Sequence, residues 1–144
     1  MKSLIGYILL SMLSSLSFAE NCSISMFYDD KIQNIIDTNS FIFSNYDRVC
    51  QQLKQANAGI NIMAISMINE REVVATAVIQ LNDKRFPLLS DMNRSSIWSS
   101  PQRTTKEQKA LIWEAINEAT SAINQHDIDA LNETRKKLGF KTYP

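Results

Sequence analysis

The sequence holds one histidine, His126, and histidine is the residue type that most often serves as a general base at neutral pH. A hydrolase built on a serine, a histidine and a carboxylate would have to use His126 as its general base. The neighbouring Asp127 is better placed to begin a helix, and no serine has the Gly-x-Ser-x-Gly spacing of an exposed nucleophile. The sequence therefore favours an exposed turn histidine over a catalytic one.

Two pairs of carboxylates lie close together in the sequence, Asp29 with Asp30 and Glu70 with Glu72. Adjacent helical residues point about 100° apart, so the two aspartates do not face each other. The two glutamates fall in an expected turn, and both pairs are interpreted as solvated charge. The spacing of a calcium loop is missing, and three glycines cannot build a glycine-rich phosphate cradle. We therefore predict no metal site and no cofactor.

Two cysteines, Cys22 and Cys50, are the candidates for covalent chemistry. They lack Cys-x-x-Cys spacing, and no nearby histidine completes a metal site. In an oxidising compartment this pair favours one structural disulfide over two free thiols. Closing a loop of this size stabilises the fold by about 3.6 kcal/mol in the chain-entropy account. The bridge would join the segment around Cys22 to the helix that carries Cys50.

Two tryptophans are the candidate binding residues. Trp98 lies among the four serines of residues 95–100, a composition weakly typical of a binding loop. Trp113 lies slightly off the apolar stripe of an expected helix, where it either packs at the core edge or anchors an interface. Core packing is the favoured interpretation for Trp113, and Met63 and Met67 are also expected in the core.

Helical spacing of apolar residues predicts two N-terminal helices, over residues 27–40 and 44–59. In the second, Ser44 is the expected N-cap and Gly59 the expected end. Cys50 falls on the inward face of this helix, which suits a buried disulfide.

Residues 60–82 hold two apolar, β-rich runs separated by a short polar stretch. This pattern predicts an antiparallel β-hairpin, with a helix over the same residues as the alternative. The second face of each strand is also apolar, which predicts cover on both sides or a central position in the sheet. Residues 82–103, with Pro87 and Pro101, are expected to be irregular, with at most a short strand near Trp98.

Two C-terminal helices are expected to form a helical hairpin. Thr105 and Gln108 make the expected capping box of the first, and Asp127 is the expected N-cap of the second. The basic run at residues 134–137 is interpreted as a solvated last turn that faces the helix dipole. The C-terminal tail is expected to be loose.

These elements together predict an α+β fold: a small antiparallel sheet built on the hairpin at about 60–82, two N-terminal helices and a C-terminal helical hairpin. The size suits a single domain with one core.

Residues 1–19 have the features of a secretory signal peptide: an early positive charge, an apolar stretch, and small side chains at Ser17 and Ala19. A membrane anchor is the alternative, but it needs about 20 mainly apolar residues, and the apolar run is roughly half that length. We predict cleavage after Ala19 and one mature domain, residues 20–144, that is periplasmic or secreted.

Without the predicted signal peptide the chain carries 14 basic and 15 acidic side chains, a formal net charge of −1. This balance gives no electrostatic basis for binding nucleic acid or an anionic membrane. We also expect no stable membrane insertion after cleavage.

The poor catalytic inventory favours a protein that acts by binding another envelope or secreted protein, as an inhibitor, an immunity-type protein or an accessory subunit. A small-ligand carrier, with a pocket between the hairpin and the long C-terminal helix, is the alternative. A small hydrolase that uses His126 or carboxylates is a further alternative.

Overall fold

The computed structural model describes residues 22–144, so the predicted signal peptide and cleavage site lie outside the described residues. The elements follow in the order β1 (Met26–Phe27), α1 (Asp30–Asn39), α2 (Tyr46–Gln55), β2 (Ala58–Ile68), β3 (Val73–Asp83), β4 (Leu89–Ser100), α3 (Thr105–Ser121) and α4 (Gln125–Lys137). The described chain therefore has four helices and a four-stranded sheet. This confirms the predicted α+β fold, with two N-terminal helices and a C-terminal helical hairpin.

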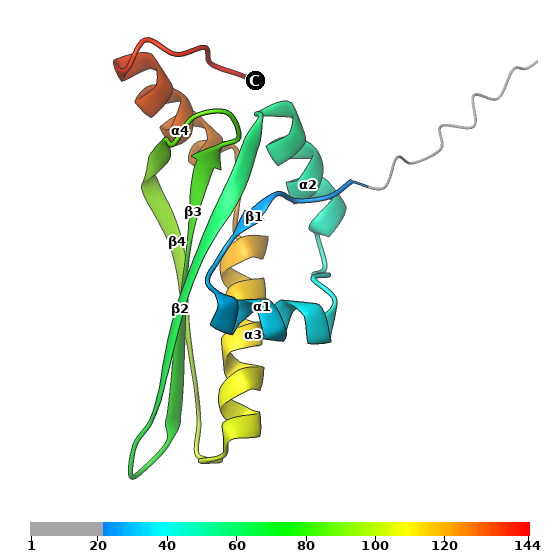
Figure 1. Cartoon of the computed structure of the whole chain (residues 1–144), viewed down its shortest axis with the longest axis vertical. Helices are drawn as coiled ribbons and strands as arrows, with labels where there is room; N and C mark the ends of the chain where they lie inside the picture. The colour runs from blue at the N-terminus through cyan, green and yellow to red at the C-terminus, as the bar shows by residue number, and fades with distance from the viewer. Residues whose placement is uncertain (1–21) are drawn as a thin grey trace, which may run out of the picture.

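The sheet has the strand order β1-β2-β3-β4. Strands β2, β3 and β4 form an antiparallel meander, and the short β1 adds to β2 in parallel, which makes the sheet mixed. The predicted hairpin is present, with β2 and β3 paired from Ala58↔Asp83 to Ile68↔Val73. Figure 1 shows these long strands nearly edge-on, with α1, α2 and α3 all on the same side.

The prediction of an irregular segment at residues 82–103 is wrong. Strand β4 has twelve residues and pairs with β3 along most of its length. The strand was hidden because small polar residues replace the usual apolar ones on its helix-covered side, where Ser90, Ser96 and Ser100 are buried. A strand of this kind is defined by its pairing with β3 and by the helices above it, and not by its own hydropathy pattern.

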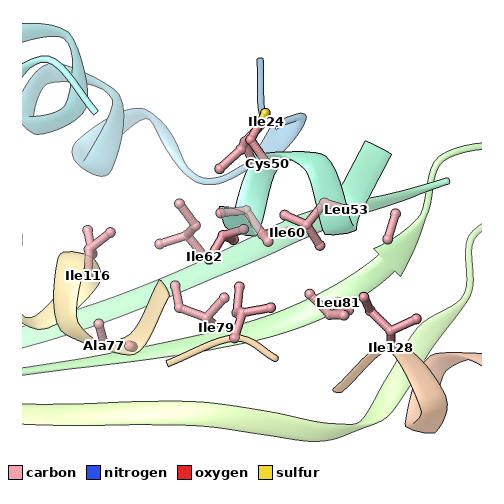
Figure 2. Packing of buried hydrophobic residues seen from close by; sticks show 14 of the residues in the cluster. Ile24, Cys50, Leu53, Ile60, Ile62, Ala77, Ile79, Leu81, Ile116 and Ile128 are labelled. Atoms are coloured by element: carbon pink, nitrogen blue, oxygen red, sulfur yellow. The ribbon is translucent and has the colours of Figure 1, made fainter. Parts of the chain in front are cut away.

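The hydrophobic core lies between the helices and one face of the sheet. Figure 2 shows its central side chains: Ile60 and Ile62 from β2, Ala77, Ile79 and Leu81 from β3, Leu53 from α2, Ile116 from α3 and Ile128 from α4. All four helices therefore contribute to a single core, since α1 adds Ile32 and Ile36 to the same cluster.

The predicted disulfide is confirmed between Cys22 and Cys50, with Cα atoms 6.0 Å apart. Cys50 is buried on α2, and the Tyr46 hydroxyl of the same helix donates a hydrogen bond of 3.1 Å to the Cys22 carbonyl. The bridge thus holds the chain that leads into β1 against α2.

Three predicted helix ends move by a few residues in the first half of the chain. Helix α1 begins at Asp30, later than predicted, because Phe27 belongs to β1 and Asp29 is the N-cap of the helix. Asn45, and not Ser44, precedes α2. Gly59 lies inside β2, and Asn57 makes the turn between helix and strand with a φ of 49°.

The caps of the last two helices also differ from the prediction. Thr104, and not Thr105, caps α3, because its side chain accepts a hydrogen bond from the Glu107 N–H. Asn124 caps α4, and Asp127 takes the third helical position, where its carboxylate accepts the Asn124 N–H in a capping box. The helical hairpin is correct, with its second helix starting slightly earlier.

The interpretation of residues 134–137 as a solvated turn is wrong for Arg135, which is fully buried. Its guanidinium forms an ion pair of 2.7 Å with Asp83 at the end of β3. The Tyr143 ring lies 4.7 Å from this guanidinium, and the Tyr143 backbone bonds to Asn132. The C-terminal tail is therefore attached to α4 and is not loose. None of the helices in the described residues is long and apolar enough to span a membrane.

Candidate functional site

One face of the sheet carries no helix in the described part of the chain (Figure 1). Successive strand residues point to opposite faces, so the neighbours of the buried β3 residues point away from the helices. The register places these side chains in rows across the strands: Met67, Val74 and Ser99; Ile65, Thr76 and Ile97; Met63, Val78 and Ser95. We call this surface, together with Phe27 of β1, the open face.

The open face is apolar and exposed. Ile65 is 76% exposed and Ile97 69%, with Met67, Phe27 and Met63 between 59% and 49%. The rows hold no charged side chain, since their polar members are threonine and serine. The expectation that Met63 and Met67 lie in the core is therefore wrong, because β2 is covered on its other side.

The size of this surface is comparable to that of apolar patches that often form binding sites. Phe27 pairs with Asn61, so the open face runs along β2 from residue 61 to residue 67, about 23 Å at roughly 3.3 Å per residue. Three strands at roughly 4.8 Å spacing cover about 14 Å. The resulting area of about 300 Å² reaches the range of the largest apolar patch on a typical monomer, which is often a binding site.

A groove with a volume of about 490 Å³ adjoins one end of the open face, where β3 turns into β4. It is lined by Phe27, Asn61, Asn82 and residues 84–89. Phe86 forms one wall and stacks on Phe140 of the C-terminal tail, with ring centroids 4.4 Å apart. The groove and the open face share Phe27, so they form one continuous surface.

Asp83 fixes the turn that builds this groove. One carboxylate oxygen accepts the backbone N–H groups of Arg85 at 2.7 Å and Phe86 at 3.1 Å, and the other pairs with Arg135. Burial raises the pKa of Asp83, but the hydrogen bonds from Arg85, Arg135 and Phe86 outweigh burial and hold the pKa below its ordinary 3.8. A single charged group thus links β3, the groove turn and α4.

Trp98 lies on the helix-covered side of the edge strand β4. Its indole N–H donates a 2.7 Å hydrogen bond to Glu118 of α3, and the Ser96 hydroxyl donates to the same carboxylate. These two hydrogen bonds hold the pKa of Glu118 below its usual value of 4.5. Trp98 therefore has a structural partner in Glu118. It is also 39% exposed, so its side chain is accessible to a binding partner. Its role in binding stays a prediction.

Trp113 is half-buried on α3 and packs edge-on against Phe41, with ring centroids 5.9 Å apart. Phe41 also contacts Phe43 and Tyr46, so this tryptophan joins an aromatic cluster at the edge of the core. This position agrees with the favoured core interpretation, and a role of Trp113 at an interface stays a prediction.

The structure does not bring His126 together with a nucleophile in the described residues. His126 is exposed in the first turn of α4, and its backbone N–H donates to the Asn124 side chain. Asp127 is buried instead against Arg94, at 2.8 Å, and serves the helix cap. No side chain of the described chain hydrogen bonds to the imidazole.

The carboxylate pairs are likewise separate from any shared site. Asp29 accepts two backbone N–H groups as the cap of α1, and Asp30 is exposed beside it. Glu70 and Glu72 lie in the turn between β2 and β3. Within residues 22–144, no group of three or more histidine, cysteine, aspartate or glutamate side chains could hold a metal ion.

A second hollow, of about 400 Å³, lies between β2, α1 and α3, with Ala64, Gln108 and Ile112 among its lining residues. This is the place in which the sequence predicted a ligand pocket, between the hairpin and the long helix. Gln108 also donates a 2.9 Å hydrogen bond to Ser66 at its edge.

Comparison of the chain with protein-family models, with curated proteins and with solved structures finds no match. Function is therefore inferred from the geometry of the described residues.

Proposed function

We propose that this chain is a small exported protein that binds another protein through the open face. The observation that carries the proposal is an uncharged apolar surface on one side of the sheet, in which Ile65 and Ile97 lie opposite each other across β3 and are more than two-thirds exposed. A surface of this kind is typical of a binding site.

The energetics favour a protein partner. Full burial of one isoleucine side chain stabilises a complex by about 1.5–3 kcal/mol. The polar side chains of the open face are short and uncharged, so covering them removes no ion from water. A partner that covers Ile65 and Ile97 together would gain its central contacts from one row of the sheet.

The Cys22–Cys50 disulfide supports export, because such bridges persist in oxidising compartments. Together with the signal-peptide features of residues 1–19, it favours a periplasmic or secreted protein. Within that setting an inhibitor, an immunity-type protein or an accessory subunit would each act by surface complementarity.

The test is chemical crosslinking and capture from the native envelope, with residues 20–144 as bait and mass spectrometry as the readout. We expect one stoichiometric partner that is lost with Ile65→Gln/Ile97→Gln. The matched control is Ile42→Gln/Leu138→Gln, because these side chains are also well exposed and lie outside the open face. Trp98→Ala tests separately whether the predicted Trp98 contact belongs to the same interface.

Three results would contradict the proposal. The first is a partner that is captured equally by the open-face variant and the wild-type protein. The second is the absence of any partner when circular dichroism shows a folded bait. The third is a crosslinked product of two copies of this chain, which would make the open face a surface for self-association and not a site for a different protein.

The hollow between β2, α1 and α3 favours a second candidate function, a carrier of a small ligand. A thermal-shift screen with a metabolite panel tests it, with Ala64→Met as the variant that fills the hollow. Stabilisation by one compound, abolished by Ala64→Met, would support the carrier. Stabilisation that survives this substitution would place the compound elsewhere.

A further inference from the structure

The groove at the end of the open face combines apolar walls with two cations. Phe27, Phe86 and Leu89 supply exposed apolar surface, and the side chains of Lys84 and Arg85 stand beside them. Among the described residues, neither cation forms an ion pair or a side-chain hydrogen bond. This differs from Lys137 nearby, which pairs with Asp91 at 2.9 Å.

We propose that this groove receives an acidic, apolar peptide segment of the protein partner. The proposal rests on the proposed function and names the chemistry of the partner at one part of its surface. Asp or Glu side chains would meet Lys84 and Arg85, and neighbouring apolar side chains would pack on the aromatic walls.

The size of the site supports an extended partner. A standard protein–protein interface covers about 800 Å² on each side, well above the roughly 300 Å² of the open face. A partner seated on Ile65 and Ile97 therefore extends past the ends of the face. At the β3–β4 end it meets the groove, where Phe27 belongs to both surfaces.

The groove favours a peptide over a fatty acid. It is an open channel at the surface, whereas a fatty acid needs an enclosed apolar cavity for its tail. Asn61 lines the groove, and its half-buried amide makes no hydrogen bond within the described residues, so it is available to a peptide backbone.

The groove is also held in shape before binding. The Asp83 carboxylate fixes the backbone of Arg85 and Phe86, and the Phe86 ring is backed by Phe140. A preformed site loses less conformational entropy on binding than a mobile loop would.

The experiment is selection from a displayed library of random twelve-residue peptides on immobilised residues 20–144. We expect enriched peptides that combine Asp or Glu with apolar or aromatic residues. Their affinity should fall about tenfold with Lys84→Gln/Arg85→Gln, which removes two charge-assisted contacts. The matched control, Lys106→Gln/Lys109→Gln, removes two exposed cations of α3, on the other side of the sheet, and should leave the affinity unchanged.

The inference is overturned if no peptide is enriched, if the enriched peptides lack acidic residues, or if both double variants lose the same affinity. Oleate is the second probe. If oleate stabilises the protein, this effect is lost with Lys84→Gln/Arg85→Gln, and no acidic peptide binds, the groove is a site for a lipid acid and the inference is wrong. The proposed function has its own readout, since Ile65→Gln/Ile97→Gln removes the envelope partner whether or not the groove prefers acidic peptides.

Discussion

The ion pair of Asp83 and Arg135 gives the sharpest prediction of stability. Their side chains are 2% and 0% exposed, and the charged atoms lie 2.7 Å apart. Asp83→Asn keeps the size of the side chain but leaves the guanidinium of Arg135 buried without a counterion. Breaking a buried pair in this way typically costs about 3–5 kcal/mol. That is a large part of the roughly 5–15 kcal/mol that stabilises an ordinary domain.

The assay is urea unfolding of the disulfide-bonded protein, followed by far-UV circular dichroism. With an m-value of about 1–3 kcal/mol per molar urea, the midpoint should fall by at least about 1 M. The double variant Asp83→Asn/Arg135→Met removes both charges, keeps an acceptor for the Arg85 and Phe86 N–H groups, and should be more stable than Asp83→Asn, because no buried ion is left unpaired.

Asp91→Asn is the control for loss of an ion pair as such, since Asp91 pairs with Lys137 on the surface. Exposed pairs of this type contribute little to stability, so its midpoint should stay close to that of the wild-type protein. If Asp83→Asn lowers the midpoint no more than Asp91→Asn, the assigned role of the buried pair is refuted.

Three other properties follow from the structure. Replacing Cys22 and Cys50 together by serine should lower the free energy of unfolding by about 3.6 kcal/mol, measured by urea titration, and a change below about 1 kcal/mol would contradict the loop-closure account. The pKa of Asp83 is lowered in the folded state, so ionised Asp83 stabilises the fold at pH values above its ordinary pKa of 3.8. This stabilisation is lost as the pH falls through the folded-state pKa. Thermal melts between pH 7 and pH 2 should show this acid loss, and Asp83→Asn/Arg135→Met, which lacks the titrating carboxyl group, should show less of it. Gly59→Ala would place a methyl group 2.9 Å from the Ser25 carbonyl oxygen, so it should destabilise the protein by about 1–3 kcal/mol, and an unchanged melting temperature would contradict that clash.

The parts of the fold that local patterns specify were predictable from the sequence. The alternation of small and branched residues along residues 73–81 predicts a strand, and the apolar stripe that includes Ile116 predicts a long helix. Strand β4 shows neither the alternation of a strand nor the apolar stripe of a helix, because serine occupies both of its faces at residues 95–100. Its conformation depends on pairing with β3, which is a tertiary interaction.

The candidate site was only partly predictable. The apolar character of the second face of β2 was visible in Met63, Ile65 and Met67, but local patterns do not show which face the helices cover. The buried pair of Asp83 and Arg135 joins residues 52 positions apart, so neither charge carries a local sign of its partner. The groove depends on that pair and was missed for the same reason.

Site-specific photo-crosslinking in the native envelope tests the central claim most directly. A photoreactive amino acid replaces Ile97 on the open face in one variant and Ile42, outside the open face, in the other; both positions are highly exposed. We predict one protein partner covalently attached at position 97 and none at position 42. Equal labelling at the two positions, or no partner at position 97 in a folded protein, would contradict the assignment of the open face as a binding site.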